Sequence, residues 1–300
     1  MSVRSLSRSQ LKKALDVVRK VYPETYADRK WDNTGLLIDS SVEEADDSAV
    51  KMLLTVDLTS SVAQEAVDNG CNVILAYHPF IFPNWNRLNP QSNTQHANAV
   101  KLIRNGVSVY CPHTAVDAVA GGVNDWLVKS VVNDDNSLIV SNKSIEQVSA
   151  TLEKDEEDHE VGYGRFVKLS EPIAVADVVT NLKKWLGIEY MQVASLAYER
   201  EGKLSNHKVQ SVAVCAGSGS GVFRNLNVND VDLFVTGELS HHEVLKYKEM
   251  GKAIIVCNHT NTERGYVRNF MADSIKKQDS EGIFSDIVIS KTDRDPLNTV

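Results

Sequence analysis

Residues 51–80 read KMLLTVDLTSSVAQEAVDNGCNVILAYHPF, which is the pattern of a strand, a helix and a second strand. The apolar runs Lys51–Asp57 and Val73–Tyr77 are short and continuous, as expected of buried strands. The stretch between them, Ser60–Asn69, reads as a helix. Because continuously apolar strands are typical of a sheet covered by helices on both faces, these residues predict an α/β protein.

The same alternation of apolar runs and helical stretches extends along the chain. The other expected strands are Val107–Cys111, Phe166–Leu169, Val209–Cys215, Leu233–Thr236, Ala253–Cys257 and Asp286–Ser290. The other expected helices are Ser9–Val21, Thr94–Asn105, Gly122–Val132, Val175–Trp185, His241–Met250 and Glu263–Lys277. This number of elements predicts two α/β domains, each with a mixed sheet.

A change of composition from Asn133 to Glu160 marks the expected domain boundary. It ends in the acidic run Glu153–Glu160, and a charge run of this kind is typical of a solvated loop. We therefore expect residues 1–135 to form the first α/β domain and residues 160–260 the second. We expect the C-terminal helix, at about 262–300, to pack on the first domain.

Composition narrows the functional classes. The 300 residues are 42% hydrophobic with a net charge of −8, and an acidic chain without a basic tract disfavours duplex DNA as a partner. No apolar stretch approaches the ~18–20 residues that span a bilayer, so no membrane association is expected. The four cysteines lack the close spacing of a zinc knuckle or a redox dithiol, which indicates a reducing, cytoplasmic location. Basic residues before Asp16 leave a mitochondrial location as an alternative.

Polar residues crowd immediately after the apolar strands. Five of the eight histidines lie there: His78, His113, His241, His242 and His259. In open α/β sheets, ligands bind at the carboxyl ends of strands, and imidazole with carboxylate is the donor set of Zn, Fe, Mn or Ni sites. His259 and Glu263 are four residues apart, as are His113 and Asp117, so a helix would place each pair on one face. These residues predict a site for two metal ions ~3.5–4 Å apart.

Several of these residues have a structural alternative. A lone histidine after a strand is more often a hydrogen-bonding group than a ligand. The loop of Gly217, Ser218 and Gly219 is either an anion-binding nest beside the metals or a tight strand-to-helix turn. Glu238 is either a supporting acid or an acid favoured by a helix N-terminus.

The same motifs resemble the Nif-three-like family, whose members often carry the label GTP cyclohydrolase I type 2 homologue. The shared pieces are Trp31–Leu36, His78–Phe80, His113–Asp117, Gly121–Asp125, Val214–Gly219, Thr236–His242 and His259–Gly265. The resemblance runs from about residue 5 to residue 275, in the family's order.

The resemblance implies a dinuclear site for a divalent transition metal, in the cleft between the two domains. It implies that His78, Asp117 and His259 are ligands and that Glu263 bridges both metals and takes part in catalysis. His113 lies beside the ligands in motif order and is the candidate for support or proton transfer.

Position 77 departs from the family. Bacterial members have two adjacent histidines in the first motif, whereas this chain has Tyr77 before His78. A phenolate ligand is costly near neutral pH because the free pKa is near 10. We therefore expect one firm and one weaker metal site, with core packing as the alternative role of Tyr77.

The function expected from these observations is metal-dependent hydrolysis of a small phosphate-bearing or purine-like substrate. The alternative is a non-catalytic regulatory or interaction protein, or a metal sensor, that retains the metal site. The family's name refers to interaction with a transcription co-factor, which implies a protein partner in transcription regulation. The resemblance also implies a homo-oligomer, a ring-shaped hexamer.

Overall fold

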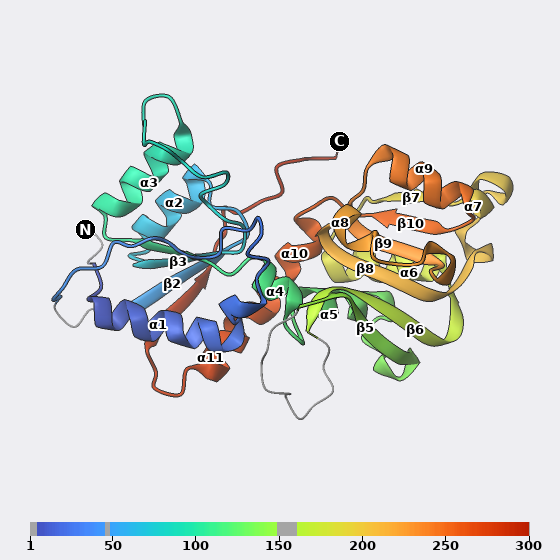
Figure 1. Ribbon diagram of the computed structural model, residues 1–300, viewed down its shortest axis with the longest axis horizontal. Helices are drawn as coiled ribbons and strands as arrows, with labels where there is room; N and C mark the ends of the chain where they lie inside the picture. Colours follow the sequence, from blue (N-terminus) through green and yellow to red (C-terminus); the bar gives the residue numbers. More distant parts are fainter. Residues whose placement is uncertain (1–4, 46–48, 149–160, 300) are drawn as a thin grey trace. The chain divides into compact units, whose positions relative to one another are not determined.

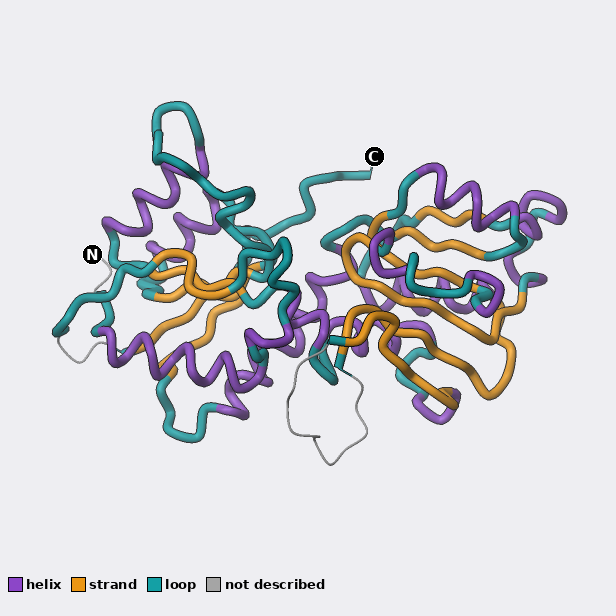
Figure 2. The backbone as a smooth tube through the Cα atoms, viewed as in Figure 1, coloured by secondary structure: helices purple, strands orange, loops and turns teal. Residues whose placement is uncertain are grey.

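The computed structural model describes residues 5–45, 49–148 and 161–299, and its backbone is drawn in Figures 1 and 2. It divides into two compact units. The first unit contains Met1–Val116 and Val267–Arg294, and the second contains Asp117–Tyr266 and Asp295–Val300. The acidic run Glu153–Glu160 lies outside the described residues.

The first unit is built on a five-stranded sheet with the order β1-β4-β3-β2-β11. Its strands are β1 (Gly35–Ile38), β2 (Val50–Thr55), β3 (Val73–Ala76), β4 (Ser108–Cys111) and β11 (Phe284–Ile289). β1 pairs antiparallel with β4, and all the other neighbours are parallel. The parallel strands therefore end at one edge of this sheet.

Helices cover both faces of this sheet (Figure 1). α2 (Ser60–Asp68) and α3 (Thr94–Arg104) lie on one face, and α1 (Arg8–Val21) and α11 (Ala272–Gln278) lie on the other. On the α2 and α3 face, strand residues such as Leu53, Ile74 and Val109 form one buried cluster with Val62 and Leu102. The short helix α4 (Thr114–Ala118) follows β4.

The second unit is built on a six-stranded sheet with the order β5-β6-β8-β9-β10-β7. Its strands are β5 (Ile139–Gln147), β6 (Gly162–Ala174), β7 (Gln192–Ala194), β8 (Lys208–Ser218), β9 (Leu233–Glu238) and β10 (Ala253–Val256). The central strands β8, β9 and β10 are parallel, whereas the outer strands pair antiparallel.

The helices of the second unit are α5 (Val123–Val131), α6 (Val175–Leu186), α7 (Leu196–Glu201), α8 (Ser220–Phe223), α9 (His241–Glu249) and α10 (Asn261–Tyr266). α5 packs against α6 and β8. α8 and α9 supply Phe223 and Tyr247 to a buried cluster in which Phe234 of β9 stacks on Tyr247, with ring centroids 4.4 Å apart. α10 packs against α5, α6 and β8, which fixes the helix that carries Glu263.

Two mixed α/β sheets with helices confirm the expected fold class. Every strand expected from an apolar run is present, and β1, β5 and β7 are additional. β5 reads IVSNKSIEQ, which is mostly polar and not an apolar run, because it is an edge strand with one neighbour and its side chains are exposed or half-buried. The sequence pattern of a fully buried strand is therefore missing there.

The ends of the units differ from the expected domain boundaries. Residues 117–135 belong to the second unit, because α5 packs on β8 and α6 rather than on the first sheet. The expected C-terminal helix at 262–300 is instead α10, a π-helical stretch at Val267–Met271, α11 and then the strand β11. α11 packs on α1, and β11 pairs with β2, so both lie in the first unit.

A buried ion pair secures α5 to the second sheet. Arg165 of β6 is 2% exposed and donates from Nε and Nη2 to the two carboxylate oxygens of Asp125, at 2.7 and 2.8 Å. Its Nη1 donates to the carbonyl oxygens of Gly162 and Gly164. Burial acts to raise the pKa of Asp125, but the hydrogen bonds and charge of Arg165 outweigh it and hold that pKa below its ordinary value.

We expect Asp125→Ala to destabilise the protein by about 3–5 kcal/mol, because it leaves the buried Arg165 guanidinium without its carboxylate. Urea unfolding at neutral pH measures this loss. Asp134→Ala is the matched control, since Asp134 forms an exposed ion pair with Lys129 of α5 at 3.6 Å. This substitution should cost less than about 1 kcal/mol. Equal losses in the two variants would contradict the assignment.

The same pair predicts a pH dependence. The pKa of Asp125 is lower in the folded state than in the unfolded chain, so its contribution is complete above the unfolded value of about 3.8. That contribution is lost as the pH falls through the folded pKa. The difference in unfolding free energy between the wild type and Asp125→Ala should therefore shrink below about pH 4.

Candidate metal centre

Asp57 and His78 meet at the carboxyl edge of the first sheet. β2 and β3 pair in parallel with Thr55 opposite Ala76, so the residues two positions beyond them are also neighbours. His78 Nδ1 lies 2.9 Å from Asp57 Oδ1. Because a carboxylate accepts, Nδ1 carries the proton, and in the neutral ring Nε2 is then the nitrogen with the lone pair.

His113 is held in the same way at the end of β4. Its Nδ1 lies 2.7 Å from Asp32 Oδ1, and the other Asp32 oxygen accepts from the backbone N–H and the hydroxyl of Thr114. The Asp32 side chain is fully buried, and burial acts to raise its pKa, but the bonds from His113 and Thr114 hold that pKa below its ordinary value. His113 adopts a positive φ of 28°, an uncommon conformation for a residue with a side chain.

Aromatic rings surround these two histidines. The centroids of His78 and His113 are 5.5 Å apart, and Tyr77 lies edge-on to both at 5.1 and 5.8 Å. Tyr77 is 1% exposed, and its backbone carbonyl accepts from the Cys111 thiol. Trp31 lies edge-on to His113 at 5.6 Å.

In the second unit, His259 and Glu263 form the corresponding pair. β10 ends at Val256, Asn258 adopts a left-handed conformation, and His259 precedes α10. His259 Nε2 lies 3.4 Å from Glu263 Oε1, which confirms that their four-residue spacing places them together. His259 Nδ1 faces Glu238 Oε2 at 3.2 Å, so Glu238 supports this histidine from the end of β9.

Gly217 makes room for this pair. A Cβ at position 217 would lie 2.8 Å from Glu263 Oε1 and 2.9 Å from His259 Nε2, and the residue has a φ of +62°. Its N–H donates to Thr262, and the N–H of Gly219 donates to the Glu238 carbonyl. Two of the N–H groups expected to form an anion nest are therefore engaged within the protein, and the close approach to His259 and Glu263 is what requires a glycine.

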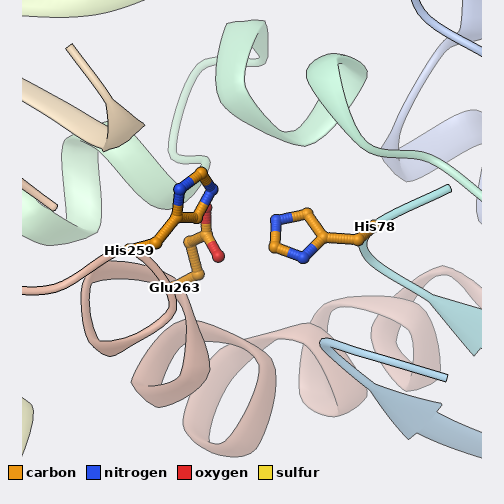
Figure 3. Close-up of side chains that lie close together, drawn as sticks. All are labelled: His78, His259 and Glu263. Carbon is orange, nitrogen blue, oxygen red and sulfur yellow. The ribbon is translucent and has the colours of Figure 1, made fainter. Parts of the chain in front are cut away.

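Among the residues described by the structure, His78, His259 and Glu263 form the one group of three potential ligand side chains (Figure 3). One ligand atom from each lies within 4.8 Å of the other two. Two imidazoles and a carboxylate fit a borderline divalent ion such as Zn, Fe, Mn or Ni. The group is therefore a candidate metal-binding site.

The remaining expected residues lie outside this group. Asp117 lies in α4, near Cys215. Burial raises the pKa of the Cys215 thiol, and the negative charges of Asp117 and Glu263 raise it further. His241 and His242 are exposed at the start of α9. Cys111 and Cys257 are buried, and burial raises the pKa of Cys257 to about 12, which disfavours a thiolate ligand.

The sequence profile of the family described as Duf34/NIF3 (NGG1p interacting factor 3) matches residues 9–296. The chain belongs to this family. It is 54% identical over 298 residues to NGG1-interacting factor 3 of Saccharomyces cerevisiae, covering 98% of each chain. It is 39% identical over 294 residues to protein NIF3 homolog of Schizosaccharomyces pombe, covering 97% of this chain and 98% of the relative.

Solved structures of other proteins share the fold. A Bacillus cereus protein related to NIF3 superposes with a TM-score of 0.77 at 18% identity, over 96% of this chain and 98% of that chain. Reduced HcgD from Methanocaldococcus jannaschii superposes with a TM-score of 0.70 at 17% identity, over 96% of this chain and 97% of that chain. None of the helices in the described residues is long and apolar enough to cross a membrane.

The sequence does not identify Asp57 and Asp32 as acids that orient histidines, whereas a supporting acid is one of the two roles expected of Glu238. Asp57 reads as a strand end before a helix cap, and Asp32 reads as part of a turn. Two of these acids share a positional signal. Asp57 follows β2, which pairs in parallel with the strand that leads to His78, and Glu238 ends β9, which pairs in parallel with the strand that leads to His259. Asp32 carries no such signal, since it precedes the antiparallel edge strand β1.

We expect Gly217→Ala to disturb the His259–Glu263 pair, because the added methyl group overlaps both side chains and the left-handed backbone strains any L residue. Zinc bound per chain, measured by mass spectrometry after loading and desalting, should fall well below that of the wild type. Gly221→Ala, in α8 directly after this loop, is the matched control, since its Cβ would meet nothing within 4 Å. Full zinc retention by Gly217→Ala would contradict the steric argument.

Proposed function

We propose that the protein binds a divalent transition metal through His78, His259 and Glu263. The observation that carries the proposal is that each of the two imidazoles has a carboxylate at Nδ1, from Asp57 or Glu238. A carboxylate at Nδ1 orients the ring, as is usual for a histidine that ligates a metal. His259 Nε2 and Glu263 Oε1 already face one another at 3.4 Å.

We propose further that the site hydrolyses a small phosphate-bearing or purine-like molecule. When bound, a divalent transition metal supplies Lewis-acid chemistry toward a phosphoryl or carbonyl oxygen. His113 serves as the proton-transfer residue, since Asp32 holds its Nδ1 and the ring lies beside His78. In this proposal Asp117, together with Glu263, would hold a second, weaker metal.

Aromatic side chains beside His113 support a planar substrate. Trp31 is 54% exposed and Phe82 is 50% exposed, with ring centroids 6.3 Å apart. Asp28 accepts a hydrogen bond from the indole N–H of Trp31 at 3.0 Å, which fixes the orientation of the ring. Exposed, fixed aromatic rings offer faces on which a heterocyclic base can stack.

A regulatory protein that holds a metal without turnover is the second candidate. The observation that favours it is Tyr77, which is buried at the position where the family resemblance implies a second histidine, so that one metal would lose an imidazole. The relative from Saccharomyces cerevisiae is named as an NGG1-interacting factor, and an interaction of this type would give this chain a role that needs no turnover.

Metal content tests the proposal first. The wild type should retain at least one equivalent of Zn²⁺ per chain after loading and desalting, and His259→Ala should retain less than about a tenth of that. The reason is that the variant removes the ligand that faces both Glu238 and Glu263. Inductively coupled plasma mass spectrometry gives the stoichiometry.

His241→Ala is the control, since His241 is exposed and lies outside the ligand group. It should bind as much metal as the wild type. Failure of the wild type to retain Zn, Mn, Fe or Ni after reloading would reject the metal assignment. With a full site, absence of hydrolysis of GTP and other nucleotides would favour the regulatory role.

Tyr77→His discriminates between the two candidates. Its ring would lie beside His78 and His113, where Tyr77 now lies edge-on to both, so it restores an imidazole to the first motif. If the site is a weakened hydrolase, we expect about one additional equivalent of metal and increased nucleotide hydrolysis. Unchanged metal content and activity would show that position 77 serves core packing.

A further inference from the structure

A buried carboxylate near the C-terminus contacts the strand end that carries Asp57. Asp293 is 4% exposed, and its two oxygens accept from the backbone N–H groups of Val56 and Asp57, at 3.1 and 3.4 Å. The contact joins residues 237 and 236 positions apart in the sequence. It exists because β11 pairs in parallel with β2, which brings the segment after β11 to the same edge of the sheet as Asp57.

Val56 and Asp57 position both the backbone and the ring of His78. The backbone N–H of His78 donates to the Val56 carbonyl at 3.0 Å, and its Nδ1 donates to the Asp57 carboxylate at 2.9 Å. The Asp57 carbonyl accepts from the Thr55 hydroxyl at 2.9 Å. Asp293 therefore completes the hydrogen bonding of the two residues that position both the backbone and the ring of His78.

The segment that carries Asp293 is itself anchored to α2. The Glu65 carboxylate accepts from the Ser290 hydroxyl, from the N–H groups of Lys291 and Thr292, and from the Thr292 hydroxyl, at 2.6–3.2 Å. The Ser290 hydroxyl also accepts from the N–H of Asp293 at 3.1 Å. These bonds leave Asp293 little freedom to move away from Val56 and Asp57.

A second carboxylate of the same segment makes an independent contact beside His259. Asp295 Oδ2 accepts from the Thr260 hydroxyl at 2.6 Å, and that hydroxyl in turn accepts from Arg264 at 2.7 Å. Thr260 and Arg264 directly follow His259 and Glu263 in the chain. Acids of the C-terminal segment thus touch the immediate neighbours of the candidate ligands.

We propose that Asp293 is a positioning residue of the metal site, acting through Asp57 on His78. The proposal rests on the proposed function for its metal-binding consequence. The orientation of the His78 ring, in contrast, is a property of the metal-free protein. A residue that merely completed the β-sheet would stabilise the fold without changing either the metal affinity or the state of the His78 ring.

Zn²⁺ affinity, measured by competition with a chromophoric chelator, gives the first test. Asp293→Ala should weaken binding about tenfold, the lower end of the effect of losing an outer hydrogen-bond partner of a ligand. Thr292→Val is the matched control, since it removes a hydrogen bond from the same segment to Glu65 without touching Val56 or Asp57, and it should stay within about twofold of the wild type. An unchanged dissociation constant for Asp293→Ala would overturn the proposal, whatever happens to its melting temperature.

A double-mutant cycle tests the route through Asp57. Asp57→Asn weakens the support of His78 directly, so adding Asp293→Ala to it should change the zinc affinity by less than about twofold. A further tenfold loss in the double variant would show that Asp293 acts independently of Asp57 and would overturn the proposed route.

The imidazole nitrogen resonances of His78 in the metal-free protein give a readout that needs no metal. The wild type and Thr292→Val should show one tautomer, protonated at Nδ1, and Asp293→Ala should show a mixture. If the wild type binds no zinc, the proposed function fails and this readout alone decides the positioning role. If Asp293→Ala does not fold, Asp293→Asn keeps one acceptor oxygen and should give an intermediate loss in both readouts, and wild-type behaviour of that variant would overturn the proposal.

Discussion

The position of His78 depends on the parallel register of β2 and β3. Thr55 lies opposite Ala76, so Asp57 and His78 emerge together and form a hydrogen bond between residues 21 positions apart. The same register gives the His78 backbone its acceptor on Val56. If this pairing shifted by one residue, the side chains of Asp57 and His78 would lie on opposite faces of the sheet and could no longer form a hydrogen bond. The position of His78 therefore depends on the register of the sheet, which is set by the buried apolar residues of β2 and β3.

The strands that build this sheet are predictable because their signal is local, as in the continuous apolar run Val73–Ala76. The pairing of His259 with Glu263 is predictable for the same reason, since four residues span one helical turn. The partners of Asp57 and Asp32 are not, because each hydrogen bond joins distant segments and each acid has an adequate local explanation as a cap or turn residue. Asp293 is the extreme case, since its role exists only after β11 has paired with β2.

Gly217 shows why residue type alone does not fix a role. A glycine-rich loop after a strand is consistent with an anion nest, with a tight turn, and with close approach of two segments. All three readings use the absence of a Cβ, and they differ in where the N–H groups point and what fills the missing volume. In this loop the N–H groups of Gly217 and Gly219 bond within the protein, and the volume is taken by His259 and Glu263. The loop is therefore shaped around the side chains of two candidate ligands.

The environment of His113 bears on whether the site performs catalysis. Its backbone lies at a φ of 28°, and such conformations cost about 1–3 kcal/mol and persist where the surroundings impose them. The surroundings include a fully buried Asp32 side chain, which also accepts a hydrogen bond from Thr114. Burying this carboxylate is costly, and its contact with Nδ1 orients the imidazole of His113. Yet His113 is outside the group of three candidate ligands. The same carboxylate–imidazole arrangement orients His78 and His113, and in the proposed hydrolase it suits His113 to proton transfer beside the candidate ligands.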